Sequence, residues 1–201
     1  MTASNEFPRD AHHPVDRLFV ERWSPRAFSD AEIPQQDLDV MFEAARWAPS
    51  SYNSQPWRFF YARRGTEGFA RLLGLLSPNN QQWAQRAGAL LVLASQKSFT
   101  PPDKPGRTES RSHSFDAGAA WAQFALQAHL LGYATHAMGG FDVERARVDL
   151  AMPEDFRPEI AIAVGRRGDP ATLPDALRAR EAPNARKPQA AFVFEGSYKS
   201  Q

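Results

Sequence analysis

Cysteine is absent from the 201 residues of the sequence, and this absence removes several classes of protein at once. Disulfide bonds, thiolate nucleophiles, dithiol redox centres and cysteine-ligated zinc or iron–sulfur sites are excluded. The first ten residues, MTASNEFPRD, show neither the basic nor the apolar part of an export signal. Together these two observations predict a cytoplasmic protein.

Long apolar runs and an excess of charge of one sign are also missing. The longest apolar stretch, near Ala87–Ala94, is far shorter than the roughly 18 apolar residues that span a bilayer. The chain has 24 basic and 23 acidic residues, which gives a formal net charge of +1. We therefore expect neither a membrane nor a nucleic acid as a partner.

Motifs that support catalysis by side chains alone are not found. The five histidines form no H-E-x-x-H pattern, and the chain has no G-x-S-x-G elbow, P-loop or G-x-G-x-x-G fingerprint. We expect no metal site, and we expect the histidines to be solvated or part of the core. If the protein is an enzyme, a bound cofactor is then expected to carry the chemistry, with no catalytic side chain.

Hydrophobic spacing and turn residues predict a single α+β domain over residues 1–201. Helices are expected over 11–21, from Pro34 to just before Pro49, and over 69–76, 117–131 and 144–151. Asp116 is the expected N-cap of the helix 117–131, which is rich in alanine and should be buried, with Gly132 just after its end. Strands are expected over 58–62, 89–94, 159–164 and 191–195. Since helices and strands do not alternate regularly, we expect a central sheet of four or five strands flanked by helices.

Two segments lack a regular pattern. Residues 98–114 carry several prolines and almost no apolar side chain, which predicts a surface loop or lid. Residues 169–201 are polar, rich in proline and aperiodic. Such a tail buries little surface alone, so we expect it to lie on a partner subunit.

Three polar clusters could bind a ligand. Arg22, Ser24 and Arg26 fall within five residues of a turn, and guanidinium forks suit a phosphate group. The alternative is a solvated basic turn. The segment 49–57 holds hydroxyls and amides that could read the edge of a heterocycle, or it is simply a connector rich in turn residues. The pair Gly139–Gly140 lets a backbone approach a ligand closely, or it forms a tight turn.

Taken in order, these clusters resemble the motifs of the nitroreductase family of flavin enzymes. R-W-S-P-R-A-F matches the family pattern R-x-S-x-[RK]-x-[FY], and A-P-S-S-Y-N-S-Q-P-W-R-F is close to its most specific motif. The segment 116–142 is similar to its central helix and G-F-D turn, and R-K-P at 186–188 is similar to its phosphate-binding end. The resemblance extends from about residue 15 to residue 194.

This resemblance implies a nitroreductase-like α+β fold, an intertwined homodimer and one FMN per subunit at the interface. Arg22, Ser24 and Arg26 would hold the phosphate side and the N1–C2 edge of the flavin, and Arg186 would complete the phosphate site. Asn80 would meet the pyrimidine end of the ring, and the glycine pair would offer backbone N–H groups. Ser50, Ser51 and Asn53 would come from the partner subunit. The residues expected to bind FMN are Arg22, Trp23, Ser24, Arg26, Pro49, Ser50, Ser51, Asn53, Asn80, Met138, Gly139, Gly140 and Arg186.

The implied activity is transfer of a hydride from NADH or NADPH through flavin N5 to an electron-poor acceptor such as a nitroaromatic or a quinone. Two alternatives stay open: a flavin enzyme of different chemistry (reductive dehalogenation or a flavin-consuming reaction), and a non-catalytic FMN-binding protein. The chain departs from the family pattern at Trp23, where arginine or histidine is more usual, and at Gly139, where some members have glutamate. It also has Gln189–Ala191 in place of the usual acidic residues.

Overall fold

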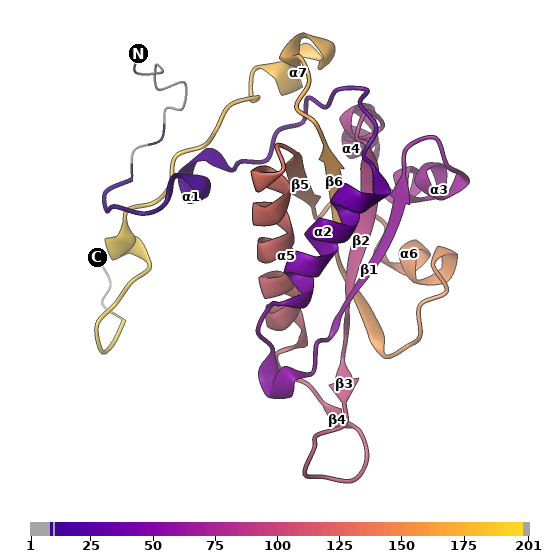
Figure 1. Ribbon diagram of the computed structural model, residues 1–201, viewed down its shortest axis with the longest axis vertical. Helices are drawn as coiled ribbons and strands as arrows, with labels where there is room; N and C mark the ends of the chain where they lie inside the picture. Colours follow the sequence, from indigo (N-terminus) through magenta and orange to yellow (C-terminus); the bar gives the residue numbers. More distant parts are fainter. Residues whose placement is uncertain (1–8, 10, 199–201) are drawn as a thin grey trace.

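Four strands form the central sheet of the computed structural model, which describes residue 9 and residues 11–198 (Figure 1). Their spatial order is β1 (Trp57–Arg63), β2 (Ala89–Gln96), β6 (Phe156–Gly165) and β5 (Ala134–Met138). Every neighbouring pair is antiparallel. The predicted α+β class and the mostly antiparallel sheet are confirmed.

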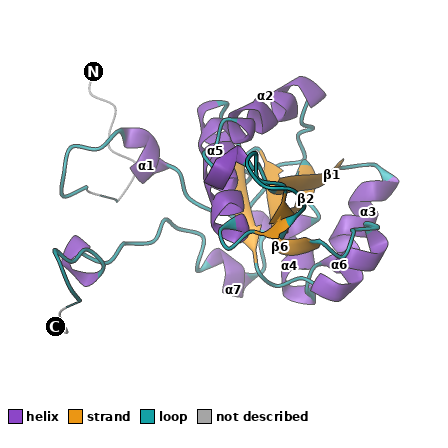
Figure 2. Ribbon diagram, turned by 90° about the horizontal axis from the view of Figure 1, so that it is seen from below, coloured by secondary structure: helices purple, strands orange, loops and turns teal. Residues whose placement is uncertain are grey.

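Helices cover both faces of this sheet (Figure 2). The helices α2 (Gln35–Arg46) and α5 (His113–Leu130) lie on one face, and α3 (Glu67–Leu75), α4 (Pro78–Ala84) and α6 (Val143–Asp149) lie on the other. Strand β2 is buried along nearly its whole length, because Leu91 and Leu93 point into the first layer while Leu90 and Val92 point into the second. A strand covered on both faces is continuously apolar, and the run 89–94 has this pattern.

Local capping residues explain where several helices begin and end. The Thr66 hydroxyl accepts a hydrogen bond from the backbone N–H of Phe69 at the start of α3, and Asp142 accepts one from Arg145 at the start of α6. Helix α5 is followed by Gly132, whose φ of 77° lies in the left-handed region that favours glycine. The predicted end of this helix is confirmed.

The remaining elements are short. They are α1 (Arg17–Glu21), β3 (Ser98–Phe99), β4 (Thr108–Glu109), α7 (Asp175–Arg178) and the 3₁₀ turns Ser51–Asn53, Pro170–Thr172 and Gln189–Ala191. Strands β3 and β4 form a hairpin inside the predicted loop 98–114, whose last two residues belong to α5. Within the described part of the chain, no helix combines the length and the apolar character needed to cross a bilayer.

Three predicted elements differ from the structure. The first helix covers Arg17–Glu21 and not 11–21, because Asp16 caps it and Pro14 precedes the cap. Asp116 is not an N-cap, since α5 begins three residues earlier, after Ser112. The predicted strand 191–195 is wrong: a 3₁₀ turn ends within it, and its apolar side chains are exposed with no neighbouring strand.

Among the elements that were not predicted, α4 and β5 belong to the layers of the domain. Helix α4 starts with proline and asparagine, which read as a turn in the sequence, although proline suits the first position of a helix. Strand β5 has five residues and includes Thr135 and His136, so it lacks an apolar pattern. After β6 the chain leaves the sheet and runs beside the N-terminal segment (Figure 1). Residues 1–8 and 10 of the predicted domain and residues 199–201 of the predicted arm lie outside the described residues.

Candidate functional site

The basic turn 22–26 is fixed to the end of strand β6 by backbone contacts. Phe28, which is fully buried, forms an isolated bridge with Arg167. The N–H of Gly168 donates to the carbonyl of Ala27 at 2.8 Å. A Cβ at Gly168 would lie 2.5 Å from backbone atoms of Phe28, so only glycine allows this approach. The turn is therefore held rigidly at the edge of the core.

A carboxylate from the C-terminal segment holds the same turn from the other side. Glu181 Oε1 accepts hydrogen bonds from the backbone N–H groups of Arg26 at 2.7 Å and Ala27 at 2.8 Å. These residues are 155 and 154 positions apart from Glu181 in the sequence. The two ends of the chain thus meet at this point, and a cavity forms between them.

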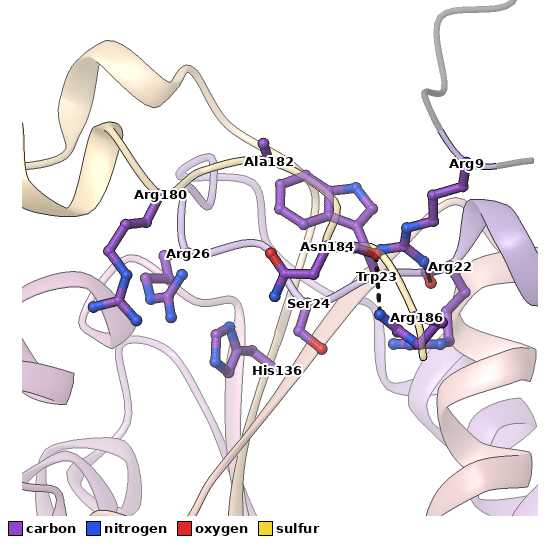
Figure 3. A pocket seen from close by; sticks show the side chains of 10 residues that line it. All are labelled: Arg9, Arg22, Trp23, Ser24, Arg26, His136, Arg180, Ala182, Asn184 and Arg186. Atoms are coloured by element: carbon purple, nitrogen blue, oxygen red, sulfur yellow. Dashed lines mark hydrogen bonds between the residues drawn. The ribbon is translucent and has the colours of Figure 1, made fainter. Parts of the chain in front are cut away.

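The cavity has a volume of about 160 Å³ and is lined by residues from both chain ends (Figure 3). Five of its residues are arginines, namely Arg9, Arg22, Arg26, Arg180 and Arg186. The other lining residues are Trp23, Ser24, His136, Ala182 and Asn184. The predicted residues Arg22, Trp23, Ser24, Arg26 and Arg186 are thus brought together in one place, although residues 26 and 186 are far apart in the sequence.

The arginines of this cavity form a cluster of positive charge. None of the five forms an ion pair with a carboxylate among the described residues. Burial lowers the pKa of Arg22, and the nearby charge of Arg186 lowers it further. Burial also lowers the pKa of Arg9, with Arg186 and Arg22 adding to the effect. Guanidiniums this close together repel one another, and a bound anion would relieve the repulsion.

Two further polar groups line the cavity. His136 Nδ1 lies 2.9 Å from the carbonyl oxygen of Pro25, and since a carbonyl only accepts, Nδ1 carries the hydrogen. Burial is the main cause that lowers the pKa of His136 to about 4, and the charge of Arg26 adds to it, so the ring is neutral at neutral pH. The buried Nε1 of Trp23 has no hydrogen-bond partner among the described residues. A buried N–H without an acceptor is unfavourable, and an anionic or polar ligand could satisfy it.

The predicted glycine pair lies at the end of strand β5, which also carries His136. Asn80 Nδ2 donates to the carbonyl of Gly140 at 3.0 Å, so these two predicted site residues are in contact. A Cβ at Gly140 would lie 3.0 Å from both Asn80 Nδ2 and the hydroxyl of Ser77. At Gly139 there is open space, and this residue is exposed. Met138, in contrast, is buried in the core below the pair.

The loop that contains Pro49, Ser50, Ser51 and Asn53 does not reach the cavity within one chain. It lies beside the start of α5, whereas Arg22 lies near the end of this helix, where it lines a second cavity together with His129. The 13 residues of α5 from Asp116 to His129 separate the two places by roughly 20 Å along the helix, at about 1.5 Å per residue. Figure 1 shows the loop at the opposite end of the sheet from the basic turn.

The backbone of this distant loop is unusual. Four non-glycine residues in the described chain have positive φ, and three of them are Tyr52, Asn53 and Gln55, with φ between 47° and 52°. Such residues are energetically unfavourable and cluster at functional sites. The observation supports a functional role for the loop and is independent of its sequence motif.

Sequence reasoning missed five residues of the cavity: Arg9, His136, Arg180, Ala182 and Asn184. Arg9 is held in place because its Nη1 donates to the carbonyls of Val20 and Arg22, both at 3.1 Å. No local motif marks these positions, since each reaches the cavity only through tertiary contacts. Among the described residues, no group of three or more histidines and carboxylates is placed to hold a metal ion.

Comparisons with known proteins agree on one family. The model of the nitroreductase family matches residues 20–76 and 70–166. A Streptomyces coelicolor protein with the provisional name NADH dehydrogenase/NAD(P)H nitroreductase is 28% identical over 185 residues, which cover 85% of this chain and 91% of that protein. A solved structure described as an oxidoreductase containing FMN is 43% identical, with a TM-score of 0.92 and full coverage of both chains.

A solved structure from Desulfovibrio desulfuricans, in complex with FMN, shares the fold. It is 22% identical, with a TM-score of 0.70, and the match covers 94% of this chain and all of that chain. The matched family segments include the basic turn, the strained loop and the glycine pair, but not Arg186. The chain belongs to the nitroreductase family.

Proposed function

We propose that the protein is an FMN-dependent oxidoreductase that passes a hydride from NADH or NADPH to an electron-poor acceptor such as a nitroaromatic or a quinone. The observation that carries the proposal is the cavity with five arginines and no carboxylate partner among the described residues. A phosphate group is the natural counter-ion, because it carries up to two negative charges and accepts hydrogen bonds from guanidinium forks.

The residues of the cavity fit the phosphate end of FMN. Arg9, Arg22 and Arg186 influence one another electrostatically, so they can bind one anion together. The unpartnered Nε1 of Trp23 offers one further donor. Arg26 would place positive charge beside the N1–C2 edge of the ring, where it stabilises negative charge on the reduced flavin. The glycine pair would present backbone N–H groups to the other edge.

The complete site is proposed to need two chains. Ser50, Ser51 and Asn53 lie roughly 20 Å from the basic turn along α5 in one chain, so they would come from the partner subunit of a homodimer. The C-terminal segment 169–198 would pack on that partner, which would cover its apolar side chains. Those of Phe192, Val193 and Tyr198 are 61, 60 and 77% exposed in a single chain.

The hairpin of β3 and β4 is proposed to border the acceptor site. The ring of Phe99, in β3, contacts the ring of Tyr52 in the strained loop, with centroids 5.5 Å apart. This contact places the hairpin beside the loop, where it would act as a lid over the ring. When bound, FMN supplies the redox chemistry, and the residues of the chain orient it and exclude water. Because His136 is neutral and donates to Pro25, it is not poised as an acid, and solvent would supply protons. Location in the cytoplasm remains a prediction.

Two measurements test this proposal. FMN should raise the melting temperature of the apoprotein, because a ligand that binds only the folded state stabilises it by mass action. Anaerobic NADH or NADPH should then bleach the flavin absorbance, and a nitroaromatic or quinone should restore it. A melting temperature unmoved by saturating FMN would overturn the proposal. Bound FMN without bleaching would indicate a non-catalytic flavin protein, and bleaching without turnover of nitro compounds or quinones would indicate different flavin chemistry.

A further inference from the structure

Asp116 is a buried carboxylate that holds the strained loop from outside. Its side chain is in the first turn of α5, and the residue is 3% exposed. Its Oδ2 accepts a hydrogen bond from the backbone N–H of Ser51 at 3.1 Å and from the hydroxyl of Ser112 at 3.0 Å. The carboxylate therefore ties the loop directly to the start of the central helix.

The loop needs such an anchor because its backbone is unfavourable in isolation. Tyr52, Asn53 and Gln55 all have φ in the left-handed region. From within, the hydroxyl of Ser50 accepts a hydrogen bond from the N–H of Gln55 at 3.0 Å, and Gln55 Nε2 donates to the carbonyl of Asn53 at 3.0 Å. From other elements, two side chains bond the backbone of this turn: Asp116 accepts from the N–H of Ser51, and Arg58 Nη1 in β1 donates to the carbonyl of Gln55 at 2.9 Å.

The anchoring leaves two polar side chains of the loop, those of Ser51 and Asn53, free. The hydroxyl of Ser51 and the side-chain amide of Asn53 take part in no hydrogen bond within the described structure, and both residues are exposed. The loop is thus fixed through its backbone while the side chains of Ser51 and Asn53 are exposed. Groups held in this way bind a ligand with little loss of conformational freedom.

We propose that Asp116 is a positioning residue that pre-organises the loop for the ring of the flavin. This inference rests on the proposed function, since the flavin is the ligand in question. Asp116 does not touch the cavity of the arginines, so its effect should concern the ring and not the phosphate. The loop of each subunit would serve the flavin of the other.

Glu159 offers a matched control. Its Oε1 accepts hydrogen bonds from the hydroxyls of Ser95 at 2.5 Å and Ser114 at 2.6 Å, so it also supports the start of α5. Unlike Asp116, it makes no hydrogen bond to the strained loop. The loss of either carboxylate should destabilise the helix start, but only the loss of Asp116 should release the loop.

The experiment titrates riboflavin and FMN into the apoprotein and follows the quenching of flavin fluorescence. Asp116→Ala should lower the affinity for both ligands by the same factor, about tenfold, as expected when a hydrogen bond to a charged group is lost. Asp116→Asn should recover most of the loss, because its amide oxygen can still accept from Ser51. Glu159→Ala should lower the melting temperature and leave riboflavin affinity within twofold of the wild type.

Each result of these titrations either supports or contradicts the role proposed for Asp116. If Asp116→Ala binds riboflavin as tightly as the wild type, the loop does not need the anchor and the inference is wrong. Equal losses in Asp116→Ala and Glu159→Ala would reduce Asp116 to a general structural role. If Asp116→Ala does not fold, full affinity of Asp116→Asn supports the role of the acceptor oxygen, and a tenfold loss contradicts it. A wild-type protein that binds neither flavin refutes the proposed function itself.

Discussion

Replacement of Arg22 by glutamine should change ligand affinity and protein stability in opposite directions. Glutamine keeps a polar side chain but removes the charge. If Arg22 binds the phosphate of FMN, its loss removes a hydrogen bond to a charged group, worth about 1.5–3 kcal/mol. FMN affinity should therefore fall about 10- to 150-fold. The affinity for riboflavin, which has no phosphate, should remain unchanged.

The unliganded protein should respond in the other way. The pKa of Arg22 is lowered by burial and by Arg186, so its positive charge is less favourable in the folded protein than in the unfolded chain. Removal of this charge should leave the melting temperature of the apoprotein equal or higher. Inorganic phosphate should raise the melting temperature of the wild type more than that of the variant, because it fills the same positive cavity.

A control variant separates these effects from a general loss of positive charge. Arg17→Gln removes an arginine from the same short helix region, but Arg17 is 68% exposed, pairs with Glu21 and does not line the arginine cavity. It should change neither FMN affinity nor the response to phosphate. Equal losses of FMN and riboflavin affinity in Arg22→Gln, or a lower melting temperature of its apoprotein, would refute the reasoning.

Three further predictions concern pH, packing and the lid. The pKa of His136 is about 4 in the folded protein and ordinarily 6.5, so between pH 4 and 6.5 the unfolded chain binds a proton that the folded protein does not. The free energy of unfolding should therefore fall by about 1.4 kcal/mol per pH unit as the pH drops through this window. Urea unfolding across this window should show the slope, and His136→Asn should flatten it. Gly168→Ala places a Cβ 2.5 Å from the backbone of Phe28, so calorimetry should show a clearly lower melting temperature and titration a weaker binding of FMN. Phe99→Ala removes the ring contact with Tyr52, and steady-state kinetics should show a changed KM for the acceptor with unchanged FMN affinity.

Much of the fold could be predicted because the buried strands and the helix ends have apolar runs and turn residues that are visible in the sequence. The run 89–94 is apolar on both faces, as β2 requires, and Gly132 marks the end of α5 with a backbone conformation that glycine adopts easily. Strand β5 has no such pattern, because two of its five residues, Thr135 and His136, are polar, and the contact of His136 with Pro25 is made only in the folded chain. The sequence predicts Asp116 as the N-cap of a helix, because an aspartate that caps a helix and one that anchors a loop have the same side chain.

The candidate site could be predicted only in part. The basic turn and R-K-P supply the right residue types, and the structure places Arg22, Arg26 and Arg186 in one cavity. Arg9 and Arg180 were not predicted, since their positions depend on how both chain ends cross the edge of the sheet. The spacing of motifs along the sequence also does not indicate the distance of roughly 20 Å that α5 places between the basic turn and the strained loop.

The meeting of both chain ends at the cavity also bears on the order in which the protein is made. Sheet and helical layers are complete once β6 has been synthesised at Gly165, whereas the cavity needs Arg180, Glu181 and Arg186. A chain emerging from the ribosome can therefore bury its core before any anion site exists, at synthesis rates of about 5–20 residues per second. If the proposed FMN binds at this cavity, its loading would follow synthesis of nearly the whole chain, up to Arg186.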